Sequence, residues 1–176
     1  MGKGRFFGNI AALAALLFVV VAATGCGQSN DQGISFKALG WQLDAGGEQL
    51  LGFTGVPFDC EQALVAAILM ENRMVQGIQT ERADFRYRVS ASGLSIPQDS
   101  DPMSVFIGGA DQESAETVVL STALRNFLQN NRNQLPELPF TMVVTASVLG
   151  ITDSGDEFRT NQISLPIEFV EGGCEG

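Results

Sequence analysis

The chain has 176 residues, of which 45% are apolar, and it carries 20 acidic but only 10 basic side chains. This length fits one ordinary domain. The formal charge of −10 argues against binding to nucleic acids or to anionic lipid surfaces. The chain contains no histidine, which excludes Ser-His-Asp and Cys-His catalysis and every histidine-based metal site. Because the three cysteines are an odd number, one of them needs an explanation other than an internal disulfide.

The first 26 residues have the pattern of an export signal. Lys3 and Arg5 precede an apolar run of about fourteen residues, 10–23, which is short for a membrane-spanning helix. The run ends in Ala23-Thr-Gly-Cys26, and this ending resembles the lipobox of bacterial lipoproteins. The alternative is a secretory signal without lipid that ends near a cysteine by chance.

The lipobox resemblance implies that residues 1–25 are a signal peptide, cleaved between Gly25 and Cys26. It also implies acyl chains on Cys26 that hold the protein at the membrane of the cell envelope. Removal of the signal leaves 151 residues with a side-chain charge of −12. Residues 26–33 are small and polar and are expected to form a flexible, lipid-anchored tether. In this family an Asp after the cysteine is typical of inner-membrane retention, so Gly27 favours the outer membrane if the source has one.

The other two cysteines, Cys60 and Cys174, lie in a chain that is expected to be exported into an oxidising compartment. A disulfide between them is the natural interpretation, and two separate thiols are the alternative. Their spacing excludes a CxxC redox centre. The bond would connect the beginning of the domain to the end of the chain.

Residues 34–176 show strand periodicity more often than helical periodicity, and we expect them to form a single domain. An added hairpin is predicted over 34–58, with a bulge at Gly40. The clearest alternation runs from Glu81 to Ser92, with Phe85 and Tyr87 on the apolar side. Further strands are predicted at 140–148 and 163–169, with a register slip near 160–162 because Phe158 has the opposite parity.

Two segments need more than periodicity. Residues 64–70 are apolar on both strand faces but also contain good helix formers, so a central strand and a helix both fit. Residues 117–122 read as a strand and 123–131 as a short helix, with Thr122 as its cap. Strands at this spacing with one short helix predict a mainly all-β fold, an antiparallel β-sandwich.

Residues 64–170 resemble the late-embryogenesis-abundant type 2 or WHy domain. The resemblance rests on Asn72 in a turn, Gly77, Asp84-Phe85 in a strand and Gly93, followed by the segments at 116–128, 138–150 and 163–169. It implies an immunoglobulin-like β-sandwich, and it favours a strand over a helix at residues 64–70. It also raises a protective role under water stress as an alternative function.

The sequence contains few patterns typical of catalytic or metal-binding sites. Acidic residues gather at 99–101, 111–113 and 153–157, where calcium binding and solvated turns are both considered and turns are favoured. No catalytic site, no metal site and no cofactor is predicted. Trp41 is interpreted as a core residue rather than a sugar-stacking platform. Arg86 and Arg88 are expected to pair with acids on neighbouring strands.

The leading hypothesis is a non-catalytic envelope lipoprotein, anchored through Cys26, whose disulfide-tied sandwich binds or supports another envelope component. No nucleic-acid partner is expected. A stress-protective module and a carbohydrate- or calcium-binding module are the alternatives. These hypotheses rest on the cysteines and on the strand pattern, so they name a location and a fold more firmly than a ligand.

Overall fold

A computed structural model describes residues 35–90 and 92–174 of the chain. The described residues belong to one compact unit, residues 34–176. The predicted signal peptide, the predicted lipidation site at Cys26 and the predicted tether lie outside the described residues. The elements of this unit are β1 (Phe36–Gln42), β2 (Gln49–Leu50), β3 (Phe53–Pro57), β4 (Leu64–Asn72), β5 (Ile78–Val89), β6 (Asp99–Pro102), β7 (Phe106–Ile107), β8 (Asp111–Leu120), α2 (Thr122–Asn130), η2 (Arg132–Gln134), β9 (Phe140–Thr152), β10 (Glu157–Arg159) and β11 (Ile163–Val170).

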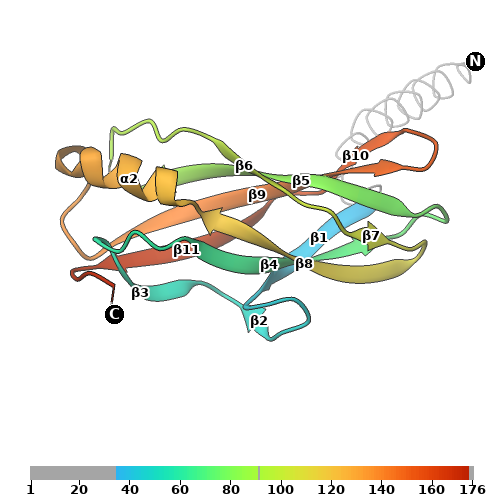
Figure 1. The fold of residues 1–176 in the computed structure, drawn as a ribbon, viewed down its shortest axis with the longest axis horizontal. Helices are drawn as coiled ribbons and strands as arrows, with labels where there is room; N and C mark the ends of the chain where they lie inside the picture. Colours follow the sequence, from blue (N-terminus) through green and yellow to red (C-terminus); the bar gives the residue numbers. More distant parts are fainter. Residues whose placement is uncertain (1–34, 91, 175–176) are drawn as a thin grey trace, which may run out of the picture. The chain divides into compact units, whose positions relative to one another are not determined.

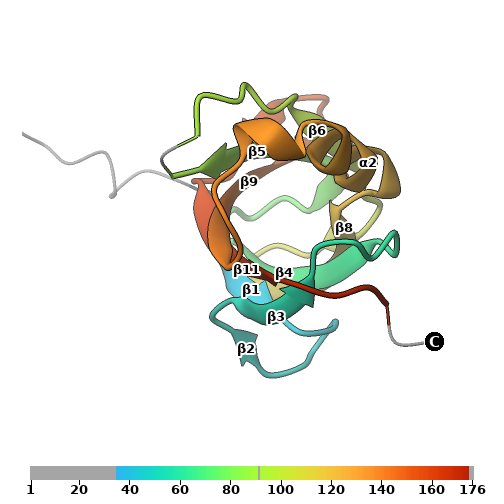
Figure 2. The same cartoon turned by 90° about the vertical axis from the view of Figure 1, so that its left-hand side faces the viewer.

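The described unit is a β-sandwich of two sheets, as predicted (Figure 1). One sheet has the strand order β2-β1-β4-β8, and the other has the order β3-β11-β9-β5-β6, with β10 paired to β9 and β7 paired to β5. Figure 2 looks along the strands and shows the two sheets enclosing the core, with α2 beside β8. The inward side chains of both sheets fill this core, among them Ile68, Met70, Phe85, Met142 and Ile167.

The strands predicted from alternation lie where the pattern placed them. In the second half of β5 the buried residues are Ala83, Phe85, Tyr87 and Val89, while the residues between them are exposed or partly exposed. Residues 64–70 are confirmed as a strand, because β4 pairs with β1 on one side and β8 on the other. Ala66, Ile68 and Met70 are buried in the core, whereas Val65 on the other face is 44% exposed, so an apolar residue on the outer face of β4 need not be covered.

The N-terminal hairpin is confirmed for β1 and β2, where Trp41 is opposite Leu50. The register with β4 shifts between Ala38 and Gly40, so the predicted bulge is also present. Trp41 is buried in the core, as expected. The chain then crosses to the other sheet, where β3 pairs with β11 in parallel. The prediction of a purely antiparallel sandwich is therefore wrong at this pair of strands.

The short helix is confirmed, with a different cap from the one predicted. Ser121, one residue before Thr122, is the N-cap, and its Oγ accepts a hydrogen bond from the amide of Leu124 at 3.2 Å. Ser121 has extended backbone angles, which let its side chain turn back over the first turn of the helix. Leu124 and Leu128 are buried against the sandwich.

One open side of the sandwich, between the edge strands β6 and β8, is closed by two carboxylates. Asp101 accepts hydrogen bonds from the hydroxyl of Thr117 and from the amide of Val118, each at 2.9 Å. Asp99 accepts one from Ser121 Oγ at 2.9 Å. The interpretation of residues 99–101 as a solvated turn is therefore wrong, because these carboxylates satisfy polar groups at the exposed edge of β8.

The opposite side of the sandwich is closed at the break between β10 and β11. Both strands pair with β9, and their registers differ by one residue, which confirms the predicted slip at 160–162. At this break the side-chain amide of Asn161 bonds both backbone groups of Ala38 in β1. Its Oδ1 accepts a hydrogen bond from the N–H of Ala38 at 3.0 Å, and its Nδ2 donates one to the carbonyl of Ala38 at 3.1 Å. Asn161 thus draws the chain away from the sheet and toward β1.

The disulfide between Cys60 and Cys174 is confirmed, with the two Cα atoms 4.7 Å apart. Arg125 of α2 lies beside it, buried, and donates hydrogen bonds to the carbonyls of Pro57 and Cys60 at 3.1 and 2.9 Å. Burial lowers the pKa of Arg125. The disulfide, the loop before β4 and the helix therefore form one connected end of the sandwich, which we call the disulfide end.

Candidate functional site

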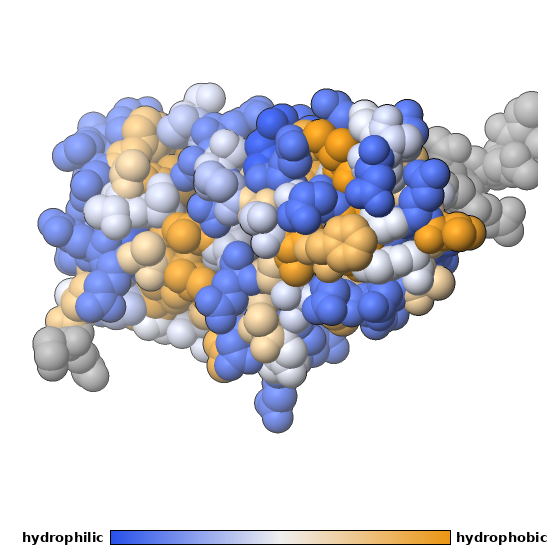
Figure 3. Space-filling model, turned by 45° about the vertical axis from the view of Figure 1, so that its right-hand side comes forward, coloured by the Kyte–Doolittle hydropathy of each residue, from blue (hydrophilic) through white to orange (hydrophobic). Residues whose placement is uncertain are grey.

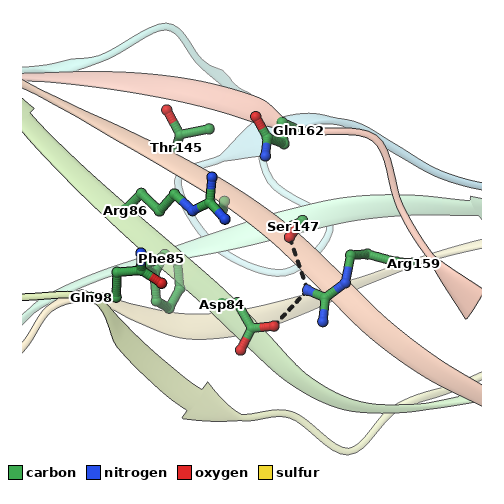
Figure 4. Close-up of a pocket in the computed structure, with 9 residues that line it drawn as sticks. Asp84, Phe85, Arg86, Gln98, Thr145, Ser147, Arg159 and Gln162 are labelled. Atoms are coloured by element: carbon green, nitrogen blue, oxygen red, sulfur yellow. Dashed lines mark hydrogen bonds and ion pairs between the residues drawn. The ribbon is translucent and has the colours of Figure 1, made fainter.

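A hollow of about 280 Å³ lies on the outer surface of the seven-stranded sheet (Figure 4). Its floor is β9, and its walls come from β5, β10, the break between β10 and β11, and the segment just before β6. The lining residues are mostly polar or charged: Asp84, Phe85, Arg86, Gln98, Thr145, Ala146, Ser147, Arg159 and Gln162. This hollow is the candidate binding site.

The strand pattern explains how these side chains reach one place. The inward residues of β5 fill the core, so the alternate residues Asp84 and Arg86 point outward. In the ladder with β9, Asp84 is opposite Ser147 and Arg86 is opposite Thr145. On the other side of β9, β10 brings Arg159 opposite Leu149, two residues beyond Ser147 on the same strand. The hollow therefore results from two strands that flank β9 with long side chains while β9 itself presents short hydroxyls.

The negative charge of Asp84 is held by two arginines. Arg159 donates to Asp84 Oδ2 at 2.5 Å and to Ser147 Oγ at 3.2 Å, and Arg82 donates to Asp84 Oδ1 at 3.0 Å. Burial by itself raises the pKa of Asp84, but the hydrogen bonds and charges of Arg159 and Arg82 outweigh burial and lower that pKa below its usual value. Asp84 is thus ionised at neutral pH and fixes the orientation of Arg159.

Arg86 and Arg88 behave differently, and the prediction that they pair with neighbouring acids is wrong. Within the described part of the chain, no carboxylate lies within 4.0 Å of either guanidinium, and neither side chain donates a hydrogen bond. The residues opposite them on β9 are Thr145 and Val143, which carry no charge. In Figure 4 the guanidinium groups of Arg86 and Arg159 lie on either side of Ser147.

The charge distribution makes this face distinct from the rest of an acidic chain. Four of the eight basic residues after residue 33 are exposed on it: Arg82, Arg86, Arg88 and Arg159. We call this surface the arginine face. The strand pattern places Arg86 and Arg88 on the polar side of a strand, but it does not single out Arg159. The run of outward arginines in β5 was the available signal, whereas the proximity of Arg159 requires the pairing of β10 with β9.

The donor groups of the hollow suit an oxyanion. A guanidinium presents parallel N–H donors that match the two oxygens of a carboxylate or the oxygens of a phosphate or sulfate. Thr145 and Ser147 add hydroxyls, and Gln98 and Gln162 add amide groups at the rim. Asp84, the carboxylate of the hollow, is already engaged by two arginines and is a weak base. The arrangement can bind and orient an anionic group.

The other residues singled out from the sequence do not join this site. Cys60 and Cys174 form the disulfide at another part of the fold. Residues 111–113 begin β8, and residues 153–156 form the turn between β9 and β10. The described residues contain no group of three or more cysteine or acidic side chains placed to hold a metal ion. Over the same part of the chain, no helix has the length and apolar character needed to cross a membrane.

Comparison with known proteins finds similarity in structure only. No family model and no curated protein matches the chain. A protein from Archaeoglobus fulgidus is 13% identical, with a TM-score of 0.42, over 61% of this chain and 83% of that one. The structural genomics target SoR45 is 12% identical, with a TM-score of 0.41, over 74% and 86%. A PapD-like domain of human CEP192 is 8% identical, with a TM-score of 0.36, over 76% and 89%.

Proposed function

We propose that this chain is a non-catalytic lipoprotein of the cell envelope, anchored through acyl chains on Cys26, and that its sandwich binds an anionic group of another envelope component at the arginine face. The lipobox pattern supports the anchor. The hollow between Arg86 and Arg159 supports the binding role, and it is the observation on which the binding part of the proposal depends. In a diderm source, the outer membrane is the favoured location.

Electrostatics gives the arginine face selectivity. The chain as a whole carries a charge of −10, so most of its surface repels anions. A local cluster of guanidinium groups on such a protein attracts an anion to one place and in one orientation. The binding of a carboxylate or phosphate group on a glycan, lipid or protein would then hold the partner in one position on the outer surface of the seven-stranded sheet.

The anchor is tested by mass spectrometry and membrane fractionation. The mature protein should begin at Cys26 and carry acyl mass on that residue, and it should sediment with membranes. Cys26→Ser should release it into the soluble fraction. A mature chain with an unmodified Cys26 that remains soluble would contradict the anchor.

The binding role is tested by crosslinking in cells. A photo-crosslinking residue at Gln162, on the rim of the hollow, should form a discrete adduct with a partner, and Arg86→Gln in the same chain should abolish that adduct. The same probe at Gln112, an exposed position on β8, is the positional control. Arg73→Gln is the charge control, because Arg73 is an exposed arginine that pairs with Glu71 outside the hollow. An adduct that survives Arg86→Gln, or equal adducts from both positions, would contradict the proposal.

A further inference from the structure

Three turns gather at the end of the sandwich opposite α2 (Figure 1). They are the β4–β5 turn at 73–77, the β7–β8 turn at 108–110 and the β9–β10 turn at 153–156. The first described residue of the chain lies there too, because the carbonyl of Ser35 accepts a hydrogen bond from the amide of Arg73 at 2.7 Å. We call this region the Asn72 end.

Asn72 holds this end together. Its side chain is fully buried, and its amide group donates to the carbonyls of Gln76, Ile107 and Gly108 at 2.8, 3.3 and 3.0 Å. Its Oδ1 accepts a hydrogen bond from the amide of Met74 at 3.0 Å. The side chain of Asn72 therefore holds the β4–β5 turn in its closed shape and also connects it to the β7–β8 turn. A turn secured in this way keeps its tip in one position.

Two large apolar side chains project from this fixed frame. Val75, at the tip of the β4–β5 turn, is 98% exposed, and Phe106 in β7 is 55% exposed. The ring of Phe106 lies over Gly77, where an added Cβ would approach Phe106 Cζ to 2.2 Å, so the ring sits directly against the backbone of the turn. Figure 3 brings this end forward and shows apolar surface there among polar groups. A rigid turn that presents valine and phenylalanine to the outside is typical of a contact surface.

We propose that the Asn72 end faces the membrane and that Val75 and Phe106 contact the surface of a zwitterionic lipid bilayer. This inference rests on the proposed anchor at Cys26. Eight residues, 27–34, separate Cys26 from Ser35, and a chain of this length spans at most about 30 Å. Because Ser35 is bonded to the β4–β5 turn, lipidation of Cys26 would keep the Asn72 end nearest to the bilayer.

Charge selects the kind of lipid. The positive charge of Arg73 is neutralised by Glu71, and the three turns and their flanks carry further acids at Asp111, Asp153 and Asp156. Such an acidic rim repels anionic headgroups. It does not repel phosphatidylcholine or phosphatidylethanolamine in the same way, because their headgroups carry no net charge. The apolar tips then provide the attraction.

The test places a fluorescent reporter at the tip in the lipidated, full-length mature protein. Val75→Cys is labelled with an environment-sensitive dye, and the protein is reconstituted into phosphatidylcholine vesicles that contain nitroxide-labelled lipid. The disulfide leaves the introduced thiol as the reactive one. Leu51→Cys is the matched control, because Leu51 is an exposed aliphatic residue, 79% accessible, on the connection between β2 and β3.

The dye at position 75 should shift its emission to shorter wavelength and be quenched several-fold more strongly than the dye at position 51. Phe106→Ser should reduce both effects, and so should replacement of phosphatidylcholine by phosphatidylglycerol. If Cys26 carries acyl mass but the two dyes behave alike, the membrane-facing inference is overturned while the anchor stands. If Cys26 carries no acyl mass, the anchor fails, and this inference fails with it.

Discussion

The disulfide end and the arginine face use arginine in opposite ways. At the disulfide end Arg125 is buried and donates to two backbone carbonyls, and the guanidinium of Arg132 lies over the rings of Phe58 and Phe140 at 5.4 and 5.9 Å. On the arginine face, Arg86 is exposed and donates to no described residue. The fold thus uses Arg125 and Arg132 for its own packing and hydrogen bonds, whereas the guanidinium of Arg86 can donate to a ligand. Changes at the first region should therefore lower stability, and changes at the second should alter binding.

The largest expected effect is the loss of the disulfide. The bond joins residues 114 positions apart, and removal of a crosslink of this length typically costs about 2–5 kcal/mol of unfolding free energy. The double variant Cys60→Ser/Cys174→Ser should show this loss in urea denaturation, and reduction of the wild-type protein should reproduce it. A midpoint unchanged by both treatments would show that the disulfide end does not depend on its crosslink.

Arg125→Met is expected to cost less, about 1–2 kcal/mol. The carbonyls of Pro57 and Cys60 lose their donor, but the variant also removes a buried guanidinium whose Nε has no hydrogen-bond partner among the described residues. The second effect partly offsets the first. Thermal unfolding measures the change. Equal stability of Arg125→Met and the wild type would mean that packing alone positions the helix.

Asp84→Asn tests the boundary between the two classes of residue. The folded-state pKa of Asp84 lies below its usual value, so its stabilising contribution is present above about pH 4 and is lost as the pH falls through the folded-state pKa. Its side chain is 31% exposed, and the cost at pH 7 should be at most about 1 kcal/mol, because solvent screens such pairs.

Unfolding of Asp84→Asn and wild type is compared between pH 3 and pH 7, with Asp153→Asn, in an exposed turn, as the control. A stability difference that grows toward low pH would reverse the sign derived from the pKa of Asp84.

The smallest stability effect is expected for Arg86→Gln, within about 0.5 kcal/mol, because the guanidinium is exposed and makes no ion pair with a described residue. Chemical denaturation at neutral pH checks this. A loss above about 1 kcal/mol would place Arg86 with Arg125 among the residues that the fold requires.

The strand periodicity was sufficient to predict the sandwich, the Gly40 bulge and the slip at 160–162, because each depends on which side of a local strand a residue faces. It did not decide between a strand and a helix at residues 64–70, where both faces are apolar, and the resemblance to the WHy domain favoured the strand. The disulfide was predictable because the assignment of Cys26 to a lipid anchor leaves two cysteines, Cys60 and Cys174, to pair with each other. The roles of Asp101 and Asn161 were not predictable, since each side chain bonds a strand of the opposite sheet. The proximity of Arg159 to Asp84, 75 residues away in sequence, likewise depends on strand order.

The binding of an oxyanion by the hollow is measured most directly by nuclear magnetic resonance of the arginine side chains during a titration with inorganic phosphate. We expect the Nε–Hε signals of Arg86 and Arg159 to shift and to saturate in the wild type, while the signal of Arg73 changes little. Arg86→Gln should remove the saturation at Arg159. Shifts that are linear and equal for all the arginines, or that persist in Arg86→Gln, would contradict a binding site on the arginine face.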